Sequence, residues 1–136
     1  MENKSILLHF HSPDGSDTAY AEHVSGDYYK LIENPIFFSD INIGMTVKAL
    51  PDEKGDLVVV KLIRASEYIT RRFLLYSGGP ASSELQEKIG NRIIEARGHW
   101  EVVFGGIVIV DIPRNGTFDL DKLFAEVNYQ PSEIKD

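Results

Sequence analysis

The first half of the chain alternates hydrophobic and polar residues with a period of two, the pattern of half-buried β-strands. In residues 5–11, for example, Leu8 and Phe10 alternate with His9 and His11. Turn sequences rich in glycine, proline and aspartate separate such segments, because these residues favour tight reversals of the backbone. The predicted strands of this half are residues 5–11, 18–25, 28–33, 45–50, 57–65 and 67–76.

Two apolar stretches of the first half are expected in its core. Residues 57–60 read Leu-Val-Val-Val, and a run of β-branched residues is typical of a buried strand. Asn34-Pro35 interrupts strand pairing, since proline cannot donate to a sheet. Residues 36–38, Ile-Phe-Phe, then form an apolar plug whose two phenylalanines are predicted to fill the core.

After residue 82 the hydrophobic period changes to that of a helix. Leu85, Ile89 and Ile93 recur every four residues on one helical face, and Ser83 with Gln86 fits a capping box at the start. Arg97-Gly98 suits the end of this helix as a cation followed by a glycine C-cap. A hairpin over residues 100–112 and a short helix capped by Asp119 or Thr117 follow, and residues after Gln130 are expected to fray.

This order of elements predicts an α+β fold of one or more antiparallel sheets, with five to eight strands and two helices. The last part, strand–helix–strand–strand–helix, resembles half of a ferredoxin-like sandwich. A length of 136 residues is near the commonest size of one domain, so residues 1–136 are predicted to form a single domain.

Composition narrows the chemistry. The chain has no cysteine, which excludes disulfides, thiolate zinc sites and cysteine nucleophiles. No apolar run approaches the ~18 residues that span a bilayer, and the first residues lack the features of a signal peptide. These observations predict a cytoplasmic protein that does not act at a membrane.

The formal charge of −7 is unevenly distributed. Residues 14–56 hold nine acids and three bases, whereas residues 57–100 hold four acids and seven bases. Net acidity disfavours non-specific binding to nucleic acids and favours a basic partner, although charge also serves solubility alone.

Metal and catalytic sites find little support. His9 and His11 point the same way on one strand and His23 lies on its neighbour, but two exposed histidines on a polar strand face explain the pattern as well. No GxSxG or HExxH motif is present, and Glu101 and Asp111 on the last hairpin are expected to be solvated. We therefore predict no cofactor, no metal and no enzymatic activity.

Two binding surfaces remain. Acidic residues of the predicted turns alternate with aromatic ones, as in a binder of a basic protein, and the residues expected to contact such a partner are Asp14, Asp17, Asp27, Tyr28, Tyr29 and Asp40. Alternatively, a basic strand over residues 61–76 could bind a nucleic acid or a nucleotide, together with the glycine loop that starts at Ser77. Its cations are Lys61, Arg64, Arg71 and Arg72, with Tyr68, Phe73 and Tyr76 between them.

Three segments resemble a bacterial family of small stand-alone domains of unknown function. They are residues 26–38 with the Asn-Pro-Ile-Phe-Phe plug, residues 43–49 with Gly44-Met45 where the family has Gly-Asp, and residues 108–113. The resemblance covers most of the chain and implies no activity. Our leading hypothesis is an acidic immunity protein that neutralises a toxin domain such as a nuclease, with nucleic-acid or nucleotide binding as the alternative.

Overall fold

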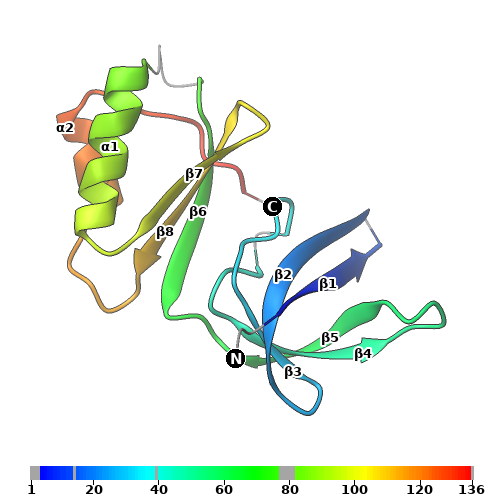
Figure 1. Ribbon diagram of the computed structural model, residues 1–136. Coiled ribbons are helices and arrows are strands. Elements are labelled where there is room, and N and C mark those ends of the chain that lie inside the picture. Colours follow the sequence, from blue (N-terminus) through cyan, green and yellow to red (C-terminus); the bar gives the residue numbers. More distant parts are fainter. Residues whose placement is uncertain (1–3, 14, 39, 77–81, 136) are drawn as a thin grey trace. The chain divides into compact units, whose positions relative to one another are not determined.

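The computed structural model describes residues 4–13, 15–38, 40–76 and 82–135 (Figure 1). The chain forms two compact units, residues 1–67 and residues 68–136. The elements of the first unit are β1 (Ser5–Ser12), β2 (Gly15–Ser25), β3 (Tyr28–Leu31), β4 (Thr46–Pro51) and β5 (Leu57–Arg64). Those of the second are β6 (Tyr68–Leu74), α1 (Ser83–Glu95), β7 (His99–Val103), β8 (Ile107–Pro113) and α2 (Leu120–Glu126).

These eight strands and two helices in the described ranges confirm the predicted α+β class. The strands form a five-stranded sheet in the first unit and a three-stranded sheet in the second. The prediction of one domain over residues 1–136 stays a prediction, and each unit is described below by itself.

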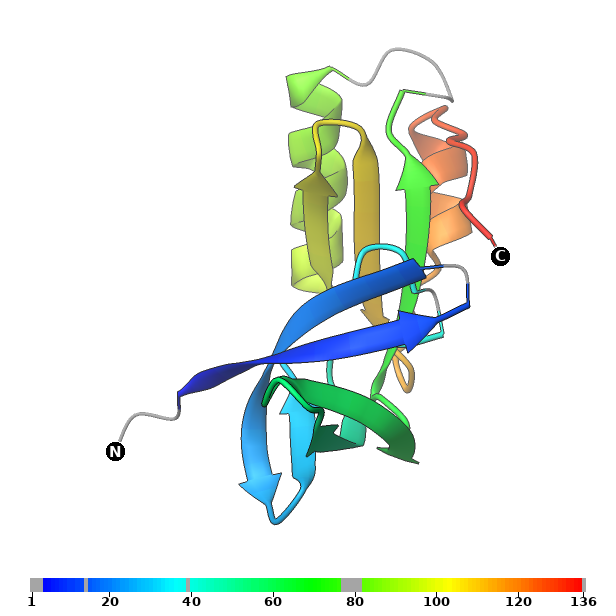
Figure 2. The ribbon, with the colours of Figure 1, turned by 90° about the vertical axis from the view of Figure 1, so that its right-hand side faces the viewer.

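The first unit is a closed barrel in which the strands pair in chain order (Figure 2). Each strand runs antiparallel to the next, and β5 closes the barrel by pairing in parallel with β1 through Leu8↔Leu57 and His9↔Val58. The inward positions alternate between bulky and small residues, which suits the narrow interior of a five-stranded barrel. The buried core is Leu8, Phe10, Ala19, Ala21, Tyr29, Leu31, Met45, Val47 and Ala49.

The apolar plug contributes one phenylalanine to this core. The ring of Phe38 packs edge-on against Phe10 with 6.1 Å between their centroids, whereas Phe37 is 63% exposed. The backbone N–H of Phe37 donates to Asp17 Oδ2 at 2.8 Å, and the N–H of Ile43 donates to Asn34 Oδ1 at 2.7 Å. These bonds hold the segment against the barrel, so the expectation that both rings are buried is wrong for Phe37.

The expectation of a buried run at residues 57–60 is also only partly right. Leu57 and Val59 pack against the barrel core, but Val60 is 55% exposed. A β5 strand with one inward and one outward face explains this pattern, because a closed barrel has water on its outside.

The second unit is a three-stranded antiparallel sheet in the order β6-β8-β7, with α1 and α2 on the same face (Figures 1 and 2). The helices bury one side of the sheet in a common apolar core. Its buried members are Phe73, Leu75, Ile89, Ile93, Val108, Val110, Leu120, Leu123, Phe124 and Tyr129.

This topology confirms the ferredoxin-like arrangement, and a fourth chain segment extends it. Glu133 forms a single antiparallel bridge with Phe73 on the free edge of β6. Two backbone hydrogen bonds flank the bridge: Leu74 N–H to Ser132 O at 2.9 Å and Ile134 N–H to Arg72 O at 2.8 Å. The segment takes the place of the last strand of a ferredoxin-like sandwich, so the expectation that residues after Gln130 fray is wrong.

The ends of α1 differ in detail from the prediction. Ser82, not Ser83, is the N-cap, and its side chain accepts from Leu85 N at 3.1 Å. At the other end Arg97, not a glycine, takes the left-handed conformation with φ 65°. The N–H of Gly98 donates to Ile93 O, and that of Arg97 to Ile94 O, at 2.9 Å each, which is a Schellman motif.

Candidate functional site

Four cations share the outer face of the barrel on β3, β4 and β5. Lys48 lies directly opposite Lys61 on one side and Tyr28 on the other. In the next row, Thr46 lies opposite Lys30 and Arg64 in the same way. We call the set Tyr28, Lys30, Lys48, Lys61 and Arg64 the basic face. Residues directly opposite in an antiparallel pair have Cβ atoms about 4.5–5.5 Å apart, so the members of each row are close neighbours.

Alternation along the strands places Tyr28, Lys30 and Lys48 outside, because their neighbours Tyr29, Leu31 and Val47 are buried. On β5, strict alternation would turn Lys61 inward, because Val59, two residues earlier, packs against the core.

Two irregularities in the β4–β5 pairing solve this problem. The register passes from Ala49↔Val59 to Lys48↔Lys61, and from Val47↔Leu62 to Thr46↔Arg64, so β5 has one extra residue at each step. Each extra residue reverses the inside–outside alternation and brings the next cation to the outer face. Bulges that re-aim side chains in this way are common beside functional sites.

Like charges directly opposite each other destabilise a sheet, and here Lys48 faces Lys61. Among the described residues no ion pair joins a cation of the basic face to a carboxylate. Glu22 borders the face opposite Lys30 on β2. Across the first unit, residues 1–67 contain eleven acids and six bases, so four of its six cations gather on one face of an acidic unit.

Four other acids of the barrel lie in its connections. Asp52, Glu53 and Asp56 occupy the β4–β5 hairpin, where the backbone N–H groups of Lys54 and Asp56 donate to Asp52 Oδ1. Asp27 lies in the turn between β2 and β3. These four acids therefore lie in connections, whereas the four cations of the basic face lie on strands; Asp17 and Glu22 are acids of β2.

The residues predicted to bind a basic protein are not brought together as one set. Asp14 lies outside the described residues, and Asp17 accepts two backbone hydrogen bonds, from Thr18 and Phe37. Tyr29 is a core residue with 8% of its surface exposed, because its strand alternates inward at that position. Three of the predicted residues are exposed: Asp27, Tyr28 and Asp40.

The three histidines of the predicted metal candidate are also separated. His9 and His11 stack with 6.4 Å between ring centroids, but His9 pairs with Thr18, five residues from His23 along β2. Five residues of strand span about 17 Å. The His23 ring instead contacts the Gly26 carbonyl at 2.8 Å, and the described part of the chain holds no group of three metal-ligating side chains.

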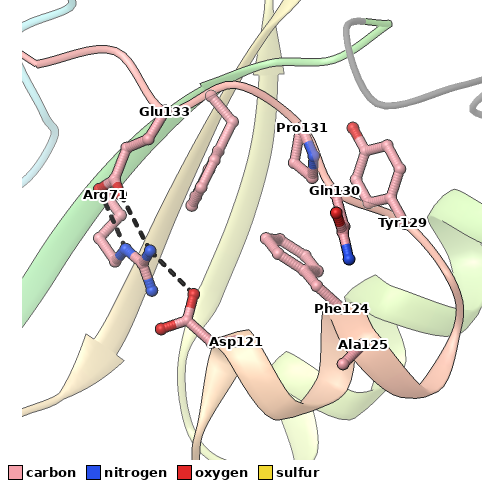
Figure 3. Close-up of a pocket in the computed structure, with 9 residues that line it drawn as sticks. Arg71, Asp121, Phe124, Ala125, Tyr129, Gln130, Pro131 and Glu133 are labelled. Carbon is pink, nitrogen blue, oxygen red and sulfur yellow. Dashed lines mark hydrogen bonds and ion pairs between the residues drawn. The ribbon is translucent and has the colours of Figure 1, made fainter.

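The predicted basic strand 61–76 is divided between the two units. Lys61 and Arg64 belong to β5, whereas Arg71 belongs to β6 and is neutralised there (Figure 3). Arg71 donates from Nε and Nη2 to the two oxygens of Glu133, at 3.0 and 2.9 Å, and from Nη2 to Asp121 at 3.0 Å. The hydrogen bond from Arg71 lowers the pKa of Glu133, and Glu133 in turn raises the pKa of Arg71.

These groups line a hollow of about 260 Å³, together with three aromatic residues and with Ala125, Gln130 and Pro131 (Figure 3). The rings of Phe73, Phe124 and Tyr129 meet there in edge-on pairs, with 5.3 and 5.4 Å between centroids. The Tyr129 hydroxyl donates to the Leu75 carbonyl, and burial raises its pKa, with a further contribution from Tyr76. The charged groups of this hollow are thus paired with one another, and they anchor the segment around Glu133. The glycine loop at residues 77–81 lies outside the described residues.

One further polar row crosses the sheet of the second unit. Thr70 Oγ1 donates to Asp111 Oδ1 at 2.6 Å, and His99 Nδ1 lies 3.4 Å from Asp111 Oδ2. Asp111 is 3% exposed, so the expectation of a solvated carboxylate is wrong for it; it lies opposite His99, and Glu101 lies opposite Ile109. This row was not predicted from the sequence.

Lys30 and Lys48 were not predicted from the sequence as members of a site. The available signal was alternation: each lysine follows or precedes a buried residue by one position on a predicted strand. Residues at such positions on consecutive, paired strands lie on the same face of the sheet.

Comparisons with known proteins show the fold and no more. Neither a family model nor a curated protein matches the chain. A solved structure of a hypothetical protein from Neisseria gonorrhoeae has a TM-score of 0.72 and 16% identity, over 98% of this chain and 95% of that one. This bacterial neighbour of unknown function is consistent with the uncharacterised family suggested by the sequence. Within the described residues, neither helix has the length and apolar character needed to cross a membrane.

Proposed function

We propose that this protein binds a phosphate-bearing polyanion through the basic face of its barrel. The observation that carries the proposal is the pairing of Lys48 with Lys61, directly opposite each other, with Lys30 and Arg64 on the same face. A repulsive pair weakens the free protein but is relieved when an anion lies between the two charges.

The surrounding charge supports the same function. No acid lies on the β3, β4 or β5 strands that carry the basic face, so this face is positive, while the net charge of −7 keeps distant, non-specific attraction to phosphates weak. Such a protein would bind a few phosphates through close contacts with the cations of the face. Because this binding releases counterions from the polyanion, its affinity would fall steeply as the salt concentration rises.

The test is a binding titration with two probes, short-chain inorganic polyphosphate and a twelve-residue oligothymidylate, each at two salt concentrations. Lys48→Gln with Lys61→Gln should abolish most of the binding to both probes. The matched control is Lys54→Gln, which removes one charge from the hairpin of the same unit and should leave binding nearly unchanged. The proposal would be refuted if neither probe bound the wild-type protein, or if the face and hairpin variants had equal effects.

A second candidate is the binding of a basic protein, such as a toxin domain, by an acidic surface. The exposed acids Asp27 and Asp40 favour it, and the exposed ring of Phe37, three residues before Asp40, could serve as an aromatic anchor. Capture of one basic protein at equal stoichiometry, lost in Asp27→Lys with Asp40→Lys, would support this immunity role. Retained capture in that variant would exclude these acids as its basis. Both candidates describe a cytoplasmic binding protein that is not an enzyme.

A further inference from the structure

The basic face carries an aromatic ring as well as cations. Tyr28 lies in the row of Lys48 and Lys61, and 40% of its surface is exposed. Within the described ranges its ring makes no ring contact and no side-chain hydrogen bond. A planar group of a ligand can stack on an exposed ring of this kind, while anionic groups of the same ligand neutralise the neighbouring lysines.

We infer that the ligand of the basic face is a single-stranded nucleic acid, with one base stacked on Tyr28 and the adjoining phosphates held by Lys48 and Lys61. This inference rests on the proposed function and adds the ligand class. Every base has a π-face, so stacking on an aromatic side chain gives affinity that tolerates sequence. In a duplex the bases are stacked on each other and their faces are not available to a side chain from the surface.

The dimensions of the face agree with one backbone. Three neighbouring strands span about 10 Å, and the two rows lie about 7 Å apart along them. The face thus offers four cations in an area that one strand of phosphates can follow, with Lys30 and Arg64 one row from the ring. Four contacts on a single strand predict a slope of log affinity against log salt of up to about −3.

The experiment measures fluorescence anisotropy of a labelled twelve-residue oligothymidylate, with inorganic polyphosphate of equal charge and a twelve-base-pair duplex as competitors. Tyr28→Ala should weaken oligothymidylate binding by about 5- to 150-fold, the effect of losing one stacked base, without changing the salt slope. Tyr28→Phe should retain the affinity, because the ring and not the hydroxyl is used. Polyphosphate binding should be the same in all three proteins.

The control variant is Tyr20→Ala. Tyr20 is an exposed tyrosine on β2, opposite Leu7 and outside the basic face, so its removal should leave binding unchanged. Circular dichroism of each variant checks that the barrel remains folded, and Tyr28→Phe keeps the test informative if Tyr28→Ala does not fold.

The outcomes separate the two claims. If polyphosphate binds through the lysines but Tyr28→Ala changes neither probe, or if the duplex competes as well as the single strand, the inference is overturned and the polyanion function stands. If neither probe binds the wild-type protein, both are refuted. A selective loss of oligothymidylate binding in Tyr28→Ala supports the inference.

Discussion

Arg71 and Glu133 are joined by two parallel hydrogen bonds, Nε to Oε2 at 3.0 Å and Nη2 to Oε1 at 2.9 Å. The pair fastens the segment around Glu133 to β6, where backbone pairing is limited to one bridge. Bidentate arginine–carboxylate pairs of this kind are stronger than single hydrogen bonds and fix geometry as well. The Arg71–Glu133 pair therefore helps to hold this segment on the sheet, as the backbone hydrogen bonds of a full edge strand do in other ferredoxin-like folds.

Glu133→Gln should lower the free energy of unfolding of the second unit by about 1–2 kcal/mol, since hydrogen bonds to charged groups contribute most. Urea unfolding followed by tryptophan fluorescence measures this unit, because Trp100 is the single tryptophan and packs against its core. The control is Glu126→Gln, whose partner Arg92 is 3.7 Å away in an exposed pair, and there we expect almost no change. Equal stabilities of wild type and Glu133→Gln would show that the segment is held by its backbone alone.

The same pair should make stability depend on pH. Arg71 lowers the pKa of folded Glu133 below its ordinary value of 4.5, so the unfolded chain takes up the proton first as pH falls. The stabilisation is fully present above that ordinary value and is lost as pH falls through the lowered folded pKa. Unfolding curves of wild type and Glu133→Gln, recorded from neutral to acidic pH, should therefore converge in acid. A stability difference that is constant at all pH values would contradict the ion-pair account.

Two glycines of the second unit should respond oppositely to alanine. A Cβ at Gly98 would lie 2.3 Å from the Asp111 carbonyl oxygen and 2.9 Å from Ile93 Cγ2, so Gly98→Ala should destabilise by about 2 kcal/mol or more. A Cβ at Gly90 would meet Trp100 Cδ1 at 3.4 Å, an ordinary contact. Gly90→Ala should thus raise the free energy of unfolding by part of the ~1 kcal/mol by which alanine is favoured over glycine inside a helix. Thermal unfolding of both variants checks the two signs, and a large loss in Gly90→Ala would show that the helix cannot yield at Trp100.

Removal of one lysine from the basic face should stabilise the barrel. Lys61→Thr eliminates the repulsion from Lys48 and introduces a residue that favours strands, so the first unit should gain about 0.2–1 kcal/mol while polyanion binding weakens. Amide hydrogen exchange of β4 and β5 measures the gain. Lower protection in the variant would mean that the lysine stem, not its charge, determines stability at this position.

Hydrophobic periodicity and the β-branched run at residues 57–60 predicted every strand of the barrel to within a few residues. They did not predict the extra residues in β5, since a bulge depends on the register with β4 and leaves the local pattern apolar. That is why Val60 was expected to be buried and why Lys61 was not placed beside Lys48. The candidate site therefore emerged only once three strands were aligned.

The prediction of one basic strand over residues 61–76 is wrong for a different reason, because the segment forms two strands and Arg71 is paired with Glu133. The local sequence around Arg71 does not show which residue will pair with it in the folded chain. Its partner Glu133 lies 62 residues further along the sequence. Likewise, Ser82 rather than Ser83 caps α1 because the cap is decided by backbone geometry, which two adjacent serines do not distinguish.

The parallel pairing of β5 with β1 has a consequence for how the barrel opens. Strands that alternate in direction can close a ring with antiparallel pairs throughout only when their number is even, so a five-stranded meander must contain one seam of the other kind. This seam comprises two residue pairs, and parallel pairing is the weaker type per residue. The β1–β5 seam is thus the weakest pairing of the barrel. Local opening of the barrel should begin there, between Leu8 and Leu57, and should let water into the interior at this point first.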